Sequence, residues 1–386
     1  MKCLGALALA LIVCGPARAE VDLVIGWLRV EVPRPPTLSD LDTTPADIGL
    51  AGARVALEEN RTTGRFLGQS YELLDASIAV DGDVTGIARD LLAATPFLVI
   101  DAPADTLLAL ADLPEATGAI LFNTSASDLF LRDTECRANL LHTAPSHAMR
   151  TDALAQFLVL RRWSDVVMVA GTYPDDVSYA DAMRRSLTKF GLRLRQEKTW
   201  AFDADMRRAA AQEIPLFTQD FGEYQALLVA DEVHDFGRYL LYNSWMPRPV
   251  MGSEGLSALA WSPVIEQWGA AQLQNRFRES AGRGMQARDY AAWAAVRTLG
   301  EAVTRTSSGD PQAVRSYILS DAFELAGFKG RPLSYRDWNG QLRQPIALAH
   351  PRALVATAPL EGFLHQTNEM DSLGLDRPES RCKAFE

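Results

Sequence analysis

Short apolar runs alternate with amphipathic helical segments along most of this chain, and this alternation constrains the fold more than any other feature. The runs are rich in Val, Ile, Leu and Phe, which is typical of strands covered on both faces. Strands that alternate with helices predict a parallel sheet flanked by helices, and 386 residues suffice for two such units. We therefore predict an α/β protein with two doubly wound lobes. The expected strands are Val21–Gly26, Tyr71–Leu74, Phe97–Ile100, Ala119–Phe122, Val166–Ala170, Ala226–Ala230 and Val250–Met251.

Helical periodicity fills the intervals between these runs. The expected helices are Ile48–Arg61, Thr85–Ala93, Ala148–Arg162, Asp175–Phe190 and Phe236–Ser244, and then Pro263–Glu279, Asp289–Thr306 and Pro311–Ser320. Two β-like segments follow, Leu333–Tyr335 and Pro345–Leu348. The Pro-rich stretch Val32–Pro45 is expected to be a loop, and the chain after Leu360 an irregular extension.

The first nineteen residues have the pattern of a secretory signal peptide. Lys2 is positive, Leu4–Val13 is apolar but too short to span a bilayer, and Ala17-Arg18-Ala19 is a small-x-small cleavage site. A transmembrane anchor and lipidation at Cys14 remain as alternatives. No later segment is apolar for long enough to cross a membrane.

Removing this leader changes the cysteine count and the charge. Cys3 and Cys14 leave with it, so Cys136 and Cys382 remain, in a compartment where disulfides persist. A disulfide between them is expected, and two separate buried thiols are the alternative. The leader also carries two basic residues, so the formal net charge changes from −11 to −13. Such an acidic chain is not an electrostatic partner for nucleic acid or anionic lipid.

The motifs that announce common enzyme classes are missing from the sequence. There is no G-x-S-x-G elbow, no Walker loop, no H-E-x-x-H and no C-x-x-C. Asp81–Gly86 begins like a calcium loop, but the twelfth position is Leu92 instead of a bidentate Glu. His365 and Glu369 have helical spacing for two metal ligands, but a tail interaction or plain exposure explains them better than a metal site. We predict no metal site, no cofactor requirement and no enzymatic activity.

Several segments together resemble the type I periplasmic solute-binding proteins of the branched-chain amino acid family. They are IGLAGARVALEENRTTGRFLGQSYELLD (48–75), LHTAPSH (141–147), DYAAWAAVRTLGEAV (289–303) and FKGRPLSYRDWNG (328–340). The resemblance covers roughly residues 21–350 and implies two lobes joined by three crossings, near Ala144, Ser253 and Gly327. It places residues 20–144 and 254–327 in lobe 1, residues 145–253 and 328–360 in lobe 2, and residues 361–386 in a C-terminal extension.

Ligands of open α/β sheets bind where loops follow the carboxyl ends of strands. This rule nominates the loops Trp27–Arg34, Ala102–Asp105, Asn123–Ser127, Tyr173–Tyr179, Asp231–Asp235 and Gly252–Gly255. The stretch Ser125-Ala126-Ser127-Asp128 is similar to the family's S-A-T-D segment, which receives a ligand carboxylate, although Ser127 could instead cap a turn. The expected ligand contacts are Trp27, Arg29, Arg34, Ala102, Asp105, Ser125, Ser127, Tyr173, Tyr179, Asp231 and Glu254.

One departure from the family concerns the ligand. The third-strand loop reads Asp101-Ala102-Pro103-Ala104-Asp105, without the hydroxyls that would hold an α-carboxylate, which disfavours a simple amino acid. Trp27, Arg29, Arg34, Tyr173 and Tyr179 favour instead a flat, anionic or aromatic solute, which aromatic faces and guanidinium groups recognise.

The C-terminal segments 342–350 and 361–385 resemble a subgroup associated with pyrroloquinoline quinone (PQQ)-dependent alcohol oxidation. The resemblance implies a periplasmic, monomeric binding protein that delivers a small solute to an ABC transporter permease. PQQ, itself flat and anionic, or an alcohol-derived metabolite is the expected ligand. The alternative is a periplasmic sensor or assembly partner of a quinoprotein dehydrogenase system.

Overall fold

The computed structural model describes residues 21–33, 44–200 and 206–386, so the predicted signal peptide and Arg34 lie outside the described residues. Five parallel strands form the sheet of a first lobe, in the order β2-β1-β3-β4-β5. Their bounds are β1 Val21–Glu31, β2 Gln69–Ala79, β3 Phe97–Asp101, β4 Ile120–Asn123 and β5 Leu140–His142.

Successive residues of a strand point to opposite faces of the sheet. Both faces of this sheet are apolar, so helices cover both. In β1, Ile25 and Trp27 join a core under α1 (Leu50–Leu67), α8 (Ala270–Ala281) and α9 (Ala287–Thr306). Leu28 and Val30 join a second core under α2 (Val84–Ala94) and α3 (Ala104–Ala111). α10 (Pro311–Ile318) packs on α9, and short 3₁₀ turns occur at Pro114–Ala116 and Leu129–Arg132.

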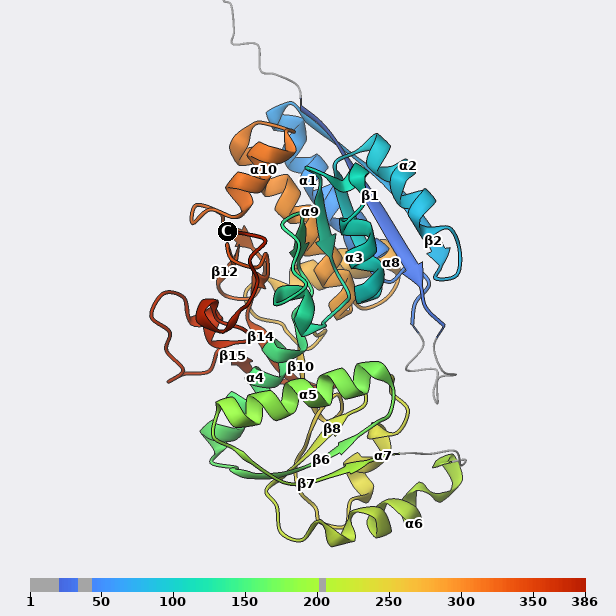
Figure 1. Ribbon diagram of the computed structural model, residues 1–386, viewed down its shortest axis with the longest axis vertical. Coiled ribbons are helices and arrows are strands. Elements are labelled where there is room, and N and C mark those ends of the chain that lie inside the picture. Colours follow the sequence, from blue (N-terminus) through green and yellow to red (C-terminus); the bar gives the residue numbers. More distant parts are fainter. Residues whose placement is uncertain (1–20, 34–43, 201–205) are drawn as a thin grey trace, which may run out of the picture.

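A second lobe is built on a seven-stranded sheet in the order β15-β14-β10-β9-β8-β6-β7. The strands are β6 Asp165–Ala170, β7 Arg193–Thr199, β8 Ala226–Ala230, β9 Val250–Gly252, β10 Leu256–Leu259, β14 Ile346–His350 and β15 Ala353–Ala358. Strands β6 to β10 run parallel to one another, whereas β14 is antiparallel to both of its neighbours, β10 and β15. One face packs against α4 (His147–Arg161) and α5 (Pro174–Lys189), and the other against α6 (Met206–Thr218) and α7 (Gly237–Asn243). Figure 1 shows the two lobes one above the other.

A small antiparallel sheet of β11 (Leu325–Ala326), β12 (Pro332–Tyr335) and β13 (Leu342–Arg343) lies beside the first lobe. Its apolar residues Leu325, Leu333 and Tyr335 belong to the core under α9. By contrast, β10 pairs in the second sheet. We therefore propose that the second crossing lies after Leu259 and the third near Gln344, later than the positions near Ser253 and Gly327 that the resemblance implied.

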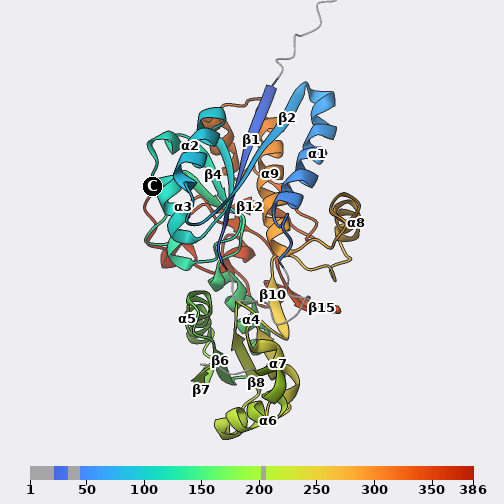
Figure 2. The same ribbon diagram turned by 90° about the vertical axis from the view of Figure 1, so that its right-hand side faces the viewer.

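The last residues, 361–386, run from the second lobe to the first and form 3₁₀ turns at Glu369–Ser372 and Arg377–Glu379. A disulfide joins Cys136 to Cys382, which confirms the predicted pair. In Figures 1 and 2 this segment, in red, follows one side of the molecule between the lobes. Met370, Leu373 and Leu375 are buried, so the segment is packed against the lobes, which its sequence alone did not predict.

The seven predicted strands and the eight predicted helices are present, most of them with shifted ends. The helix predicted at Pro263–Glu279 is wrong in its first turns, because α8 begins at Ala270. Trp27 was wrongly placed in a loop, because β1 continues to Glu31. The sequence did not predict β5, β7, β10, β11, β13, β15, α3 and α6, nor the 3₁₀ turn Gln219–Phe221.

Candidate functional site

The carboxyl ends of β6 and β8 bring two buried acids of the second lobe together. Asp176, in the first turn of α5, accepts hydrogen bonds from the backbone N–H of Tyr173 at 3.2 Å and of Glu232 at 2.6 Å. Asp231 accepts from the N–H groups of Asp235, Phe236 and Gly237, and so holds the start of α7. Burial, and then the negative charge of Asp231, raise the pKa of Asp176 to about 7.

Beside these acids, Arg150 of α4 makes a bidentate ion pair with Glu232. Its Nη1 and Nη2 donate to the Glu232 carboxylate at 2.5 and 2.9 Å, and its Nε donates to the Ala258 carbonyl at 3.0 Å. The guanidinium also lies over the Tyr179 ring, 4.8 Å from its centroid. Burial opposes ionisation of Glu232, yet the Arg150 charge outweighs it and lowers the pKa of Glu232. The pair is therefore ionised, and each guanidinium nitrogen already has an acceptor.

Two neighbouring side chains of this cluster have buried polar atoms without a hydrogen-bond partner among the described residues. They are Tyr179 Oη and His147 Nδ1. The two rings meet edge to face, with their centroids 5.5 Å apart. Burial lowers the pKa of His147 to about 4, so its imidazole is neutral at pH 7. Buried polar groups in native proteins nearly always have a partner, so these two atoms are candidates for a contact with water or a ligand.

The matching loop of the first lobe follows β4. Asn123 Oδ1 accepts from the N–H groups of Ser125 and Ala126, at 3.1 and 2.9 Å. Ser125 Oγ accepts from the Ala102 N–H at 3.1 Å and donates to its carbonyl at 3.2 Å. The Ser127 carbonyl accepts from the His147 N–H at 2.8 Å. This loop therefore bonds directly to the first turn of α4, beside the Tyr179 and His147 rings.

Carboxylates from the two lobes also come close to one another. Burial raises the pKa of Asp128, the nearby Arg132 opposes this rise, and the negative charges of Asp175 and Asp105 add to it. Asp175 lies in the first turn of α5 and Asp105 in the first turn of α3. Loops from the two sheets thus converge here, and the surface around them is acidic.

Some of the predicted ligand contacts lie at the converging loops, and others are buried or already paired with another residue. Ser125, Ser127, Ala102, Asp105, Tyr173, Tyr179 and Asp231 all lie in or beside the converging loops. Trp27 is 1% exposed and packs in the first-lobe core, so it offers no face to a ligand. Arg29 donates to the Ala46 carbonyl at 2.6 Å and lies 3.9 Å from Asp101. Glu254 Oε1 lies 3.2 Å from His234 Nδ1, so the Glu254 carboxylate is engaged with that imidazole.

The sequence reasoning missed three members of the cluster, His147, Arg150 and Glu232. His147 ends the LHTAPSH motif, and Arg150 follows it at i+3, one helical turn later. Glu232 was inside the nominated loop Asp231–Asp235 but was not singled out. The helical spacing could have drawn attention to Arg150, whereas its pairing with a residue 82 positions away could not be deduced.

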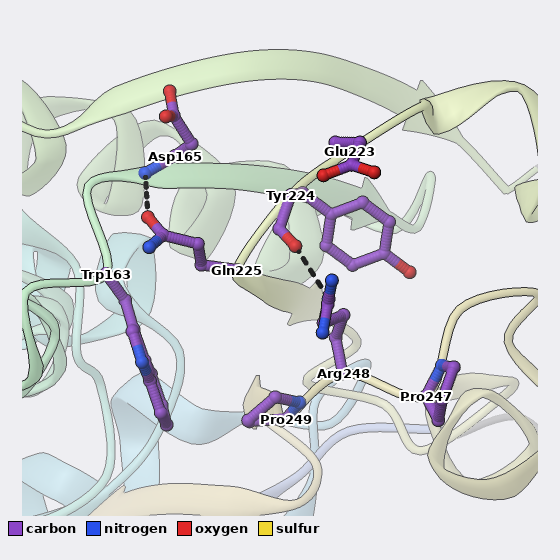
Figure 3. Close-up of a pocket in the computed structure, with 8 residues that line it drawn as sticks. All are labelled: Trp163, Asp165, Glu223, Tyr224, Gln225, Pro247, Arg248 and Pro249. Carbon is purple, nitrogen blue, oxygen red and sulfur yellow. Dashed lines mark hydrogen bonds between the residues drawn. The ribbon is translucent and has the colours of Figure 1, made fainter.

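A separate pocket of about 570 Å³ opens at the amino ends of β6, β8 and β9. Figure 3 shows its lining, with Trp163 and Tyr224 on either side of Arg248, whose Nε donates to the Tyr224 carbonyl at 2.9 Å. Since these strands are parallel, the pocket is at the opposite end of the sheet from the Arg150–Glu232 pair. Its position does not fit the rule that ligands bind at carboxyl ends.

Two further findings concern the described residues only. No three His, Cys, Asp or Glu side chains are grouped so that they could hold a metal ion. Within the described ranges, no helix has both the length and the apolar character of a membrane span.

Residues 38–212 match the family model named periplasmic binding protein. No curated protein matches the chain. Among solved structures, a branched chain amino acid ABC transporter periplasmic ligand-binding protein from Burkholderia xenovorans is 17% identical, with a TM-score of 0.71 over 94% of this chain and 100% of that one. A leucine-, isoleucine-, valine-, threonine- and alanine-binding protein from Brucella ovis is 14% identical, with a TM-score of 0.66 over 95% and 99%.

A solute-binding protein from R. palustris in complex with benzoate is 13% identical, with a TM-score of 0.63 over 94% of this chain and 99% of that one. At such identities the likeness is one of fold. The chain therefore has the two-lobed α/β fold of type I periplasmic binding proteins, as the sequence predicted.

Proposed function

We propose that the protein is a periplasmic solute-binding component of an ABC transporter, and that it binds one small molecule between its lobes without altering it. The family match over residues 38–212 and the fold support this function. The observation that carries it is the pair of buried atoms Tyr179 Oη and His147 Nδ1, which have no hydrogen-bond partner in the described part of the chain and lie beside loops from the two lobes. A ligand that contacts both lobes stabilises one lobe arrangement, which a permease would recognise.

For the ligand, we propose small aromatic compounds first. Tyr179 Oη and His147 Nδ1 are neutral polar atoms without a partner among the described residues, and both belong to aromatic rings. Both rings are buried in this lobe arrangement, at 0% and 5% exposed, so a ligand reaches them only when the loops around them move. Of the two arginines that favoured an anion, Arg29 already donates to the Ala46 carbonyl, and Arg34 lies outside the described residues. Arg150, in the cluster itself, is paired with Glu232, and nearby carboxylates repel negative charge. The proposal that PQQ or an alcohol-derived metabolite is the ligand depends only on the sequence of the C-terminal segments. These compounds are therefore tested in the same screen.

A thermal-shift screen of the mature protein tests this function. The compounds are benzoate, phenols, benzyl alcohol, PQQ, short alcohols and aldehydes, and amino acids. Any compound that binds only the native state raises Tm by mass action, and a concentration of 100 times Kd adds about 2.7 kcal/mol to the free energy of unfolding. A screen in which no compound class shifts Tm would count against solute binding.

Two variants locate the site once a compound shifts Tm. Tyr179→Phe removes only the unpartnered hydroxyl and should weaken binding roughly 5- to 10-fold, the effect of about 1 kcal/mol. Tyr224→Phe is the matched control, because Tyr224 lines the pocket at the other end of the sheet. If the control variant loses affinity and Tyr179→Phe does not, the ligand occupies that pocket and the proposed site is wrong.

A further inference from the structure

The C-terminal segment 361–386, called the tail below, contacts both lobes through polar groups of fixed geometry. On the second lobe, the Gly374 N–H donates to the buried Asp152 carboxylate at 2.8 Å. Lys189 Nζ donates to the same carboxylate at 2.9 Å and to the Gly374 carbonyl at 3.0 Å. Leu373 is fully buried in the core beneath α4 and α5. The middle of the tail is therefore fastened to two helices of the second lobe.

Further along, the tail is fastened to the first lobe. Cys382 forms the disulfide with Cys136. Arg381 donates to Asp133 from its backbone N–H at 2.6 Å and from its guanidinium at 2.6 and 3.1 Å. Ser380 donates to the Arg132 carbonyl at 3.2 Å. These contacts join the end of the tail to the loop that follows β4, the same loop that carries Ser125 and Ser127.

Around the attachment at Gly374, the tail also surrounds Arg336 of the segment joining β12 and β13. Arg336 is fully buried and donates to the Asp371 carboxylate at 2.8 Å. It also donates to the carbonyls of Met370, Leu373 and Leu375, at 3.1, 2.6 and 3.0 Å. Arg343 donates to the same Asp371 carboxylate at 2.9 and 3.0 Å. The tail thus has little freedom to lengthen between its ends.

We propose that the tail is a strap that sets the angle between the two lobes. A rotation of one lobe about the three crossings changes the separation of Asp133 and Asp152, which the strap spans. The strap must then break its hydrogen bonds or hold the lobes in place. The disulfide makes the attachment to the first lobe covalent, so lobe opening is limited while it is intact. This inference goes beyond solute binding, because the lobe angle is measured without a ligand.

Small-angle X-ray scattering of the ligand-free protein tests the strap. The first comparison is between the oxidised protein and the same protein treated with a phosphine reductant. The second uses Cys136→Ser/Cys382→Ser/Asp133→Asn, which removes the disulfide and the ion pair of Arg381 with Asp133 at the end of the tail and leaves the Asp371 pairs with Arg336 and Arg343 intact. We expect the radius of gyration and the maximum dimension to rise in each released form, and amide hydrogen exchange to become faster at Gly374 and Arg381.

The matched control is Asp112→Asn, which breaks the ion pair with Arg137, next to Cys136, and leaves the strap attached. It should scatter like the oxidised wild type. Near-UV circular dichroism verifies that each sample is folded, and the reduced wild type decides the matter if the triple variant does not fold. Scattering that is unchanged in the folded, released forms would overturn the strap. A failed ligand screen would leave it standing, so the two proposals fail separately.

Discussion

At the scale of single residues, the Arg150–Glu232 pair dominates the second-lobe site. The two side chains are only 13% and 15% exposed, so removing one partner leaves a desolvated charge. We expect Glu232→Gln to lower the free energy of unfolding by about 3 kcal/mol, measured by urea denaturation. Asp181→Asn is the control, because its pair with Arg184 is exposed and should change stability by less than about 0.5 kcal/mol. Equal losses in the two variants would contradict this view of the pair.

A second prediction concerns Asp176 and the pH dependence of the free energy of unfolding. Its pKa rises from 3.8 to about 7 in the folded protein, because of burial and then of the Asp231 charge. The native state therefore holds a proton that the unfolded chain releases, so stability falls as pH rises from about 4 to about 7 and levels off above. We expect a fall of roughly 2 to 4 kcal/mol from this group.

Asp176→Asn tests this dependence, because the amide is neutral throughout this pH range. Urea denaturation between pH 4 and pH 8 should show a weaker decline for the variant than for the wild type. The exposed Asp181→Asn should keep the wild-type slope. Parallel curves for Asp176→Asn and the wild type would mean that Asp176 is already ionised at pH 5.

At the residue level, the sequence predicted position where strand order determines it, and the ligand contacts themselves stay predictions. Ser125, Ser127 and Ala102 follow strand ends, and parallel strands bring those ends together whatever the side chains do. Trp27 failed because an apolar run does not show where a strand stops, and β1 continues to Glu31. Arg150 was missed because its importance comes from a partner 82 residues away.

At the scale of elements, the contact between α1 and α9 depends on a close backbone approach at Gly52. A Cβ atom at this position would lie 1.9 Å from the Asp289 carbonyl oxygen, in the first turn of α9. Gly52→Ala must therefore push the helices apart, and we expect it to lower the free energy of unfolding by roughly 2 kcal/mol in chemical denaturation. Arg54→Ala, an exposed position on the same helix, should change it by less than about 0.5 kcal/mol. A Gly52→Ala protein as stable as the wild type would show that the helices separate without loss.

Two of the strands that sequence analysis missed lie at the edges of the second sheet. β7 is an edge strand that reads RLRQEKT and has no fully buried residue, so it has no apolar run to reveal it. β15 occupies the opposite edge of the same sheet. β8, by contrast, is buried along its whole length and was predicted residue for residue. Periodicity therefore identified the fully buried β8 and missed β7 and also β10, which lies inside the sheet but is only partly buried.

At the scale of the whole molecule, the tail was expected to be an irregular extension, and it does contain little regular structure. Its role in joining the lobes depends on buried polar contacts between residues far apart in sequence, such as Arg336 with Asp371 and Asp152 with Gly374. Only the cysteine pair could be anticipated, because two cysteines remained after the leader was set aside. Long-range polar pairing leaves no periodic trace in a sequence.

The same contacts predict that Arg336 holds the tail in place. Arg336→Met keeps much of the side-chain volume but removes the donors that Asp371 and three tail carbonyls use. Buried acceptors without donors are costly, so we expect the free energy of unfolding to fall by about 3 to 5 kcal/mol. Limited proteolysis under native conditions should cut the tail faster, even with the disulfide intact. Arg331→Met is the control, because its pair with Glu369 is exposed. If the two variants are cut at the same rate, the buried arginine does not hold the tail, and its attachment depends on the ends alone.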